Sequence, residues 1–122
     1  MIKEIAFTVY PAKDVAKMRE FYRENLGLRF GQPFEENGTL KYDEANVGDG
    51  TFAVMTETWV ERPAGSAGSV VFEVDDLEKM RTDLIAKGIA VDDIVDFGVC
   101  TYAAFSDPEG NKVSLHQRAA GR

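Results

Sequence analysis

The sequence of 122 residues predicts an α+β fold of two tandem βαβββ modules, whose strands form a cupped mixed sheet with the helices outside. The first observation is an internal repeat, because KDVAKMREFY at 13–22 aligns with DDLEKMRTDL at 75–84, 62 residues further on. The second is that DGTFAVMTE at 49–57 aligns with EGNKVSLHQ at 109–117, 60 residues further on. Strand, helix and last strand recur in the same order, which favours duplication over chance similarity.

The repeat divides the chain into a first module at 1–61, a linker at 62–68 and a second module at 69–122. The linker, RPAGSAG, is rich in the proline, glycine and serine that interrupt regular structure. We expect both modules to form a single domain, because the length is typical of one.

In the first module, Ile5–Tyr10 is rich in the β-branched and aromatic residues of strands. A helix follows, with Asp14 as its N-cap and Gly27 as the left-handed residue that closes it. Asn37-Gly38 predicts a hairpin turn between extended runs. The three runs lie at about 28–34, 39–47 and 51–57.

The second module repeats this pattern with a strand at Ser69–Val74 and a helix between Asp76 and Gly88. Its extended runs lie at about 90–96, 99–106 and 111–118. The turn between the last two is DPEGN at 107–111, which suits a three-residue loop with a glycine bulge. That loop pairs Tyr102 with His116 and Ala104 with Ser114, whereas a two-residue loop would turn the neighbouring strand over.

Composition limits the partners. The formal net charge is −7 and no cluster of lysine or arginine is present, so we expect no nucleic-acid partner. No stretch approaches the roughly 20 apolar residues of a membrane span, so we expect no membrane partner. The N-terminus lacks a signal-peptide pattern and the single Cys100 has no internal disulfide partner. These features predict a cytoplasmic location.

Three stretches resemble one protein family: KMREFYRENLGLRF, FEVDDLEKMRTDLIAKGI and SDPEGNKVSLHQ. They are similar to the vicinal oxygen chelate superfamily, which includes glyoxalase I, extradiol dioxygenases, and fosfomycin and bleomycin resistance proteins. FTVYPAKD, a cysteine in the seventh strand and DPEGNKVSLHQR further resemble an uncharacterised glyoxalase/bleomycin-resistance-like subgroup. The resemblance implies a homodimer and a cup that holds a small molecule.

Metal enzymes of this family take His, Gln or Glu ligands from the first and last strand of each module. The resemblance places Phe7, Val54, Ser69 and Ser114 at these positions. A shift of one residue offers Ala6, Ala53, Val70 and Leu115. Neither set would hold a divalent ion well, so we expect no metal and no other cofactor. A relocated metal site using His116, Glu73 or Glu57 remains the alternative.

Strand alternation and the resemblance together predict the residues that line or border the cup. They are Phe7, Tyr42, Val54, Trp59, Ser69, Glu73, Cys100, Tyr102, Ser114 and His116. Cys100 and His116 are also the candidate catalytic residues, since an imidazole can activate a thiol. Both have structural alternatives, as a small buried apolar residue and a hydrogen-bonded histidine.

The leading hypothesis is a metal-free binding protein that holds a small apolar, aromatic or cationic compound. One alternative is a metal-dependent lyase or dioxygenase with a relocated site. A second is a metal-free enzyme that uses His116 and Cys100. A third is a structural or assembly role in which the cup has no ligand.

Overall fold

The computed structural model describes residues 1–119, which divide into two compact units. The first comprises Met1–Ala67 with Pro108–Asn111, and the second comprises Gly68–Asp107 with the chain from Lys112 onward. The boundary therefore falls within the predicted linker at 62–68. The predicted second module runs to residue 122, and residues 120–122 lie outside the described part.

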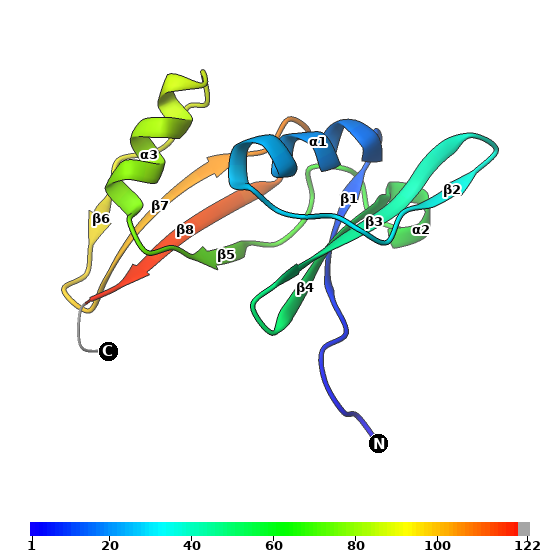
Figure 1. The fold of residues 1–122 in the computed structure, drawn as a ribbon, viewed down its shortest axis with the longest axis horizontal. Coiled ribbons are helices and arrows are strands. Elements are labelled where there is room, and N and C mark those ends of the chain that lie inside the picture. The colour runs from blue at the N-terminus through cyan, green and yellow to red at the C-terminus, as the bar shows by residue number, and fades with distance from the viewer. Residues whose placement is uncertain (120–122) are drawn as a thin grey trace. The chain divides into compact units, whose positions relative to one another are not determined.

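The first unit holds one four-stranded sheet (Figure 1). Its elements are β1 (Thr8–Ala12), α1 (Val15–Leu26), β2 (Phe34–Glu36), β3 (Thr39–Val47), β4 (Gly50–Thr56) and the short α2 (Glu57–Val60). The strand order is β1-β4-β3-β2, with β1 parallel to β4 and the other pairs antiparallel.

The second unit repeats this arrangement (Figure 1). Its elements are β5 (Val70–Glu73), α3 (Leu77–Ala86), β6 (Val95–Asp96), β7 (Cys100–Ser106) and β8 (Lys112–Arg118). The strand order is β5-β8-β7-β6, with β5 parallel to β8. The predicted α+β class and the two βαβββ modules are therefore confirmed.

Three predicted strands differ from the structure. The strand predicted at 5–10 lies at Thr8–Ala12, and it tolerates Pro11 because β1 is at the sheet edge. The run at 28–34 forms only an isolated bridge from Phe30 to Ala45 before β2 begins, since Pro33 cannot donate to a ladder. The run at 90–96 shortens to β6, after two aspartates that disfavour a strand.

The predicted capping residues are confirmed. Asp14 accepts a hydrogen bond from the backbone N–H of Lys17, and Asp76 accepts one from Lys79, each at 3.0 Å. Gly27 closes α1 with φ at 70°. Asn37 and Gly38 have φ values of 54° and 77° between paired Glu36 and Thr39, as a two-residue hairpin loop requires.

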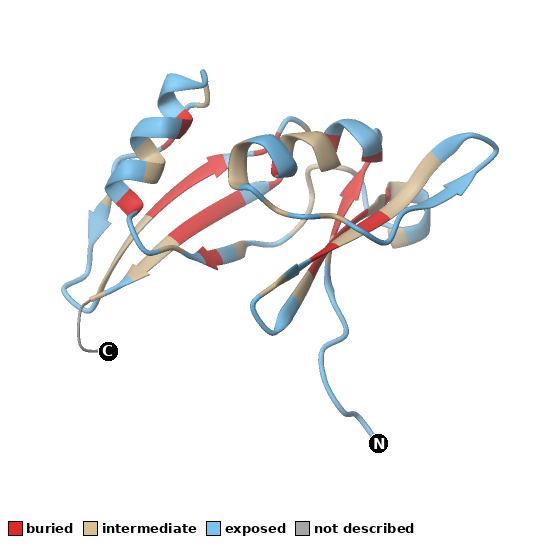
Figure 2. Ribbon diagram, in the orientation of Figure 1, coloured by how far each residue is buried: buried red, intermediate tan, exposed pale blue. Residues whose placement is uncertain are grey.

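Each sheet buries one face under the helix of its own unit (Figure 2). In the first unit, Tyr22 of α1 packs on Phe52, which also contacts Tyr10. In the second unit, α3 contacts β7 and β8 and buries Leu77 and Leu84. In each sheet, the side chains that point away from the helix form the opposite face. This face is called the first open face in the first unit and the second open face in the second unit.

The turn Pro108–Asn111 belongs to the first unit and supports α1. The Glu109 carboxylate accepts hydrogen bonds from the backbone N–H groups of Lys13 and Asp14, at 2.6 and 3.0 Å. Asn111 is fully buried and bonds to the backbone of Pro11 and Ala67. Within residues 1–119, no helix has the length and apolar character needed to cross a membrane.

Candidate functional site

The second open face is organised by the register of β5, β8 and β7. Glu73 and Tyr102 both pair with His116, one on each side, so the three side chains share a face. Val71 and Ala104 likewise pair with Ser114. The predicted pairs Tyr102–His116 and Ala104–Ser114 are confirmed, and Gly110 takes the left-handed conformation in the turn.

His116 is held by a carboxylate on the neighbouring parallel strand. Its Nδ1 lies 2.6 Å from Oε1 of Glu73, whose Oε2 accepts the backbone N–H of Arg118 at 2.8 Å. The Arg118 guanidinium lies 3.6 Å from the same carboxylate. The Arg118 N–H and the His116 ring, which hydrogen-bond to the carboxylate, lower the pKa of Glu73. Glu73 therefore orients the imidazole on this face.

Tyr102 lies beside this pair in a donor-rich setting. Ser114 donates a hydrogen bond to the phenolic oxygen at 3.4 Å, and the Lys112 ammonium lies 5.8 Å from the ring centroid. Hydrogen bonds from Ser114 and then Lys112 lower the pKa of Tyr102. Such donors favour the phenolate over the phenol.

Cys100 and His116 are not hydrogen-bonded to each other. Cys100 pairs with Arg118 at the end of the sheet, and across the described chain it makes no hydrogen bond or ion pair with His116. Cys100 and His116 therefore lie diagonally across β7 and β8, as predicted, without a hydrogen bond between the thiol and the imidazole.

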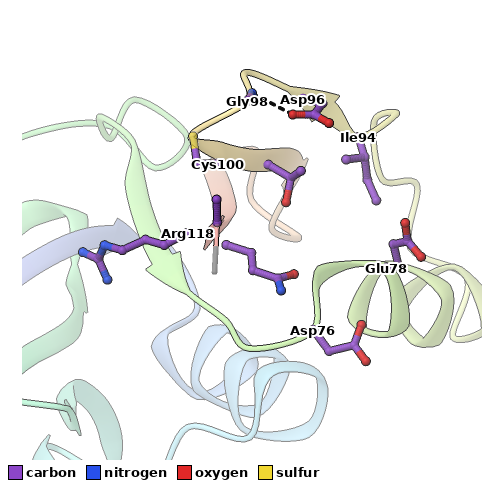
Figure 3. Close-up of a pocket in the computed structure, with 10 residues that line it drawn as sticks. Asp76, Glu78, Ile94, Asp96, Gly98, Cys100 and Arg118 are labelled. Atoms are coloured by element: carbon purple, nitrogen blue, oxygen red, sulfur yellow. Dashed lines mark hydrogen bonds between the residues drawn. The ribbon is translucent and has the colours of Figure 1, made fainter. Parts of the chain in front are cut away.

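Cys100 instead lines a hollow of about 430 Å³ between the start of α3 and the β6–β7 turn (Figure 3). Asp76, Glu78 and Asp96 contribute carboxylates to it. Two of these have local partners, because Asp76 caps α3 and Asp96 accepts the N–H of Gly98 at 2.7 Å. These two carboxylates serve the local fold.

The first open face gathers exposed aromatic rings. Phe7 contacts Tyr42 edge-on with centroids 5.8 Å apart, and Phe34 contacts Trp59 at 5.7 Å. Phe34 pairs with Tyr42 across β2 and β3, which places all these rings on neighbouring positions. Phe7, Phe34 and Trp59 remain 38%, 51% and 43% exposed. We call the surface formed by Phe7, Phe34, Tyr42 and Trp59 the aromatic platform.

Tyr42 differs electrostatically from Tyr102. Its hydroxyl donates to Oε1 of Glu44 at 2.5 Å. Burial first, and then the hydrogen bond to Glu44, raise the pKa of Tyr42. The aromatic platform therefore carries a carboxylate and a neutral phenol.

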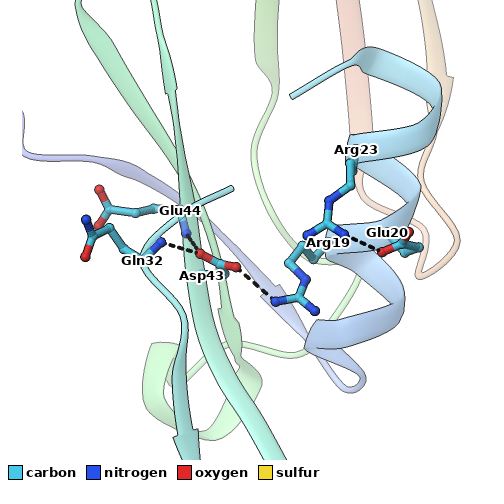
Figure 4. A network of polar contacts seen from close by, with 6 residues as sticks. All are labelled: Arg19, Glu20, Arg23, Gln32, Asp43 and Glu44. Atoms are coloured by element: carbon cyan, nitrogen blue, oxygen red, sulfur yellow. Dashed lines mark hydrogen bonds and ion pairs between the residues drawn. The ribbon is translucent and has the colours of Figure 1, made fainter. Parts of the chain in front are cut away.

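The strand that carries the platform is fixed from its other face (Figure 4). Asp43 is buried and pairs with Arg19 of α1 at 3.1 Å. Its other oxygen accepts the backbone N–H groups of Gln32 and Glu44 at 2.9 and 2.8 Å. This network ties α1, the loop before β2 and β3 together.

Val54 lies on a different face from the one predicted. It pairs with Tyr10, which contacts Phe52 on the α1-covered face, and it is fully buried. Ala53 pairs with Val9 and Glu44 and occupies the open-face position instead. The one-residue shift weighed in the sequence analysis therefore applies to β4.

The side chains at the family's ligand positions do not fit a divalent metal ion. Phe7 and either Val54 or Ala53 offer no donor atom, and Ser69 and Ser114 offer neutral hydroxyls. A relocated site fits no better. Both Glu73 oxygens are engaged beside a guanidinium, and Glu57 accepts the backbone N–H of Ala64 at 2.7 Å. In residues 1–119, no group of three or more His, Cys, Asp or Glu side chains is arranged to hold a metal ion.

Four residues of the two open faces were not among the site residues predicted from the sequence: Phe34, Glu44, Lys112 and Arg118. Strand alternation offered a signal for Lys112 and Arg118, which are two residues from Ser114 and His116. Phe34 offered none, because the run that contains it was assigned to an earlier strand.

Comparison with known proteins identifies the relatives. A family model described as Glyoxalase/Bleomycin resistance protein/Dioxygenase superfamily matches residues 4–115. An antibiotic binding protein, TnmS3 from Streptomyces sp. CB03234, is similar over 97% of this chain and 98% of its own, with 25% identity and a TM-score of 0.84. No curated protein matches this chain significantly.

Two further solved structures are similar. A glyoxalase/bleomycin resistance protein from the same Streptomyces strain has 26% identity and a TM-score of 0.76, covering 89% of this chain and 96% of its own. Lactoylglutathione lyase from Agrobacterium tumefaciens has 20% identity and a TM-score of 0.77, covering 96% and 95%. At that identity, the lyase shows a common fold alone.

Proposed function

Because the chain belongs to the Glyoxalase/Bleomycin resistance protein/Dioxygenase superfamily, we propose that it is a metal-independent small-molecule-binding protein of this type. Its ligand is a small apolar, aromatic or cationic compound. The aromatic platform carries the proposal, because exposed rings at neighbouring positions supply a surface on which a planar compound stacks.

The chemistry of the platform favours a planar cation. Aromatic faces attract cations, and Glu44 adds a carboxylate next to Tyr42. The net charge of −7 also favours a cationic ligand over an anionic one at long range. The similarity to TnmS3, which is described as an antibiotic binding protein, also supports a binding role for this chain.

Proflavine, a planar cationic acridine, is a suitable probe. Isothermal titration should give saturable binding, and the fluorescence of Trp59, the one tryptophan in the chain, should be quenched along the same curve. Phe34→Ala removes the ring that contacts Trp59 and should weaken binding by roughly tenfold, since one aromatic contact contributes about 0.5–1.5 kcal/mol beyond its buried area.

Phe97→Ala is the matched control. Phe97 is 65% exposed in the second unit and is not part of the platform, so its removal should leave the affinity within about twofold. Equal losses in Phe34→Ala and Phe97→Ala would contradict binding at the platform. Failure of proflavine and of an uncharged anthraquinone to bind at all would contradict the proposed function.

We also propose a cytoplasmic homodimer. Large apolar side chains outside the aromatic platform are exposed in both units, including Ile5, Val71 and Val99, and such surfaces often mark interfaces. The single cysteine suits a reducing compartment. Analytical ultracentrifugation at micromolar concentration should give twice the chain mass, and a monomer at that concentration would contradict the dimer.

A further inference from the structure

The open-face side of β8 carries a basic strip. Alternation along the strand puts Lys112, Ser114, His116 and Arg118 on one face, and their pairing partners Tyr102 and Ala104 confirm which face it is. In a chain of net charge −7, this strip is a local reversal of sign. Glu73 pairs with its His116–Arg118 end, so Lys112 and Ser114 remain directed at Tyr102.

The pKa values of two tyrosines at equivalent positions are shifted in opposite directions. Tyr42 pairs with Met55 in the first sheet, and Tyr102 pairs with His116 at the same place in the second. Tyr42 donates to a carboxylate, whereas Tyr102 receives hydrogen bonds from Ser114 and Lys112. The phenol of Tyr102 therefore ionises more readily than that of Tyr42.

His116 adds a second proton-transfer group beside Tyr102. Its Nδ1 is held by Glu73, and among the described residues Nε2 has no hydrogen-bond partner. Because His116 and Tyr102 are direct cross-strand neighbours, a small substrate can contact both. The imidazole is half-buried on a sheet, a rigid support for such a pair.

We propose that Tyr102 and His116, assisted by Lys112 and Ser114, form a metal-independent acid–base site that interconverts the keto and enol forms of a 2-oxo acid. Tyr102 and His116 touch the substrate, whereas Ser114 positions and stabilises the phenolate. Lys112 also offers its ammonium to the substrate carboxylate. This activity is separate from binding at the aromatic platform, since it uses residues of the second unit alone.

The reaction is balanced without an oxidant or a cofactor. The Tyr102 phenolate removes a proton from the carbon next to the carbonyl, which breaks one C–H bond and forms the phenol O–H. The electron pair moves to the carbonyl oxygen, which takes a proton from Nε2 of His116. The cycle closes when the proton gained by Tyr102 passes through water to Nε2 of His116, which restores the phenolate and the proton that His116 gave up.

The substrate class follows from the charges on this face. An enolate carries developing negative charge on oxygen, which Lys112 and the other donors stabilise. A carboxylate on the substrate matches the basic strip and is repelled by Glu44 on the aromatic platform. Proton transfer is most efficient when the catalytic pKa lies near the working pH, which a lowered phenol pKa approaches.

Phenylpyruvate tests the proposal, because its enol and keto forms differ in ultraviolet absorbance. Wild-type protein treated with a chelator should accelerate loss of the enol above the buffer rate. Tyr102→Phe should lower kcat/KM by about 10²-fold, within the range of general acid–base catalysis. Lys112→Met should lower it by roughly tenfold at neutral pH and move the basic limb of the pH profile upward. Lys79→Met, which removes an exposed ammonium of α3 in the same unit, is the control for Lys112→Met and should leave the rate unchanged.

A spectroscopic titration separates ionisation from folding. The difference in absorbance at 295 nm between wild type and Tyr102→Phe should show a phenol that ionises below the ordinary pKa of 10.0. The charged groups that act on this phenol are Lys112 on β8 and Asp92 before β6, with His116, Glu73 and Arg118 alongside. The ionisation should shift upward in Lys112→Met, whereas a structural role for Lys112 would lower only the melting temperature.

Three outcomes would overturn the proposal: no acceleration by the wild type, an unchanged rate in Tyr102→Phe, or ionisation of Tyr102 at or above the ordinary value. The proposed binding function is tested separately, since Phe34→Ala should weaken proflavine binding and leave tautomerisation unchanged. Tyr102→Phe should slow tautomerisation and leave proflavine binding unchanged. Each result therefore identifies which proposal fails.

Discussion

Replacing Asp43 by alanine should be among the most destabilising single changes in the first unit. The carboxylate is 1% exposed, and it accepts hydrogen bonds from Arg19, Gln32 and Glu44 (Figure 4). Asp43→Ala leaves these donors without their acceptor, and the arginine without its counter-charge. The β3 strand then loses its tie to α1, and with it the support for the aromatic platform.

The magnitude follows from the partners. A hydrogen bond to a charged group contributes about 1.5–3 kcal/mol. The backbone N–H of Glu44 lies within β3, so the loss of its hydrogen bond to Asp43 should cost an energy in the upper part of that range. Gln32 is exposed, so its N–H can bond to water instead. Arg19 is one-quarter exposed, so water can replace part of what the guanidinium loses. The expected loss is about 3 kcal/mol of unfolding free energy.

Urea unfolding followed by Trp59 fluorescence measures this loss in the unit that contains Asp43. With m between about 1 and 3 kcal/mol/M, the midpoint should fall by roughly 1–3 M. Glu20→Ala is the control, because it removes the exposed pair with Arg23 on the same helix and should cost about 0.5 kcal/mol or less. A loss below about 1 kcal/mol in Asp43→Ala, or one equal to the control, would refute the reasoning.

Two other predictions concern the turn and the acid dependence. Gly65 has φ at 85°, and an added Cβ would lie 2.7 Å from the Glu109 carbonyl oxygen, so Gly65→Ala should cost at least about 2 kcal/mol in thermal unfolding. Gly68→Ala, which meets nothing within 4 Å, should cost far less, and equal costs would contradict this. The pKa of Glu73 is lowered from 4.5, so its contribution to stability is complete above that value and is lost as pH falls through the lower folded-state pKa. The melting-temperature difference between wild type and Glu73→Gln should therefore shrink from pH 6 to about pH 3, and a constant difference would count against it.

Local signals in the sequence predicted much of the fold. The N-caps Asp14 and Asp76 and the Asn37-Gly38 turn depend on residues a few positions apart, and all three are confirmed. The register of β7 against β8 also follows from the turn between them. Each feature is set by short-range geometry, which the chain specifies locally.

The prediction that Val54 lies on the open face was wrong for a physical reason. The alignment matched Gly50 with Gly110, but Gly50 pairs with Val47 at the start of β4, whereas Gly110 lies in the loop between Ser106 and Lys112. The two hairpins therefore have loops of different length. As a result, equivalent residues of the last strands, such as Met55 and His116, are 61 residues apart, one more than the alignment assumed. In a strand, that single residue changes the face of every side chain.

The site depended on contacts between distant segments. Glu73 and His116 meet because β5 lies parallel to β8, and neither strand shows this pairing in its own residues. Phe34 meets Trp59 because a short helix, α2, follows β4, and the sequence analysis did not anticipate that helix. The residue types could be predicted to line a face, but their partners required the strand order.

The central claim, binding without a metal ion, is tested most directly by titrating proflavine into chelator-treated protein. The titration is repeated after reconstitution with nickel, manganese, iron or zinc. The side chains at Phe7, Ala53, Ser69 and Ser114 predict the same affinity in every case and no retained ion after dialysis. Binding that appears only with one metal, together with about one retained ion per chain, would contradict the account and identify a metal site outside these positions.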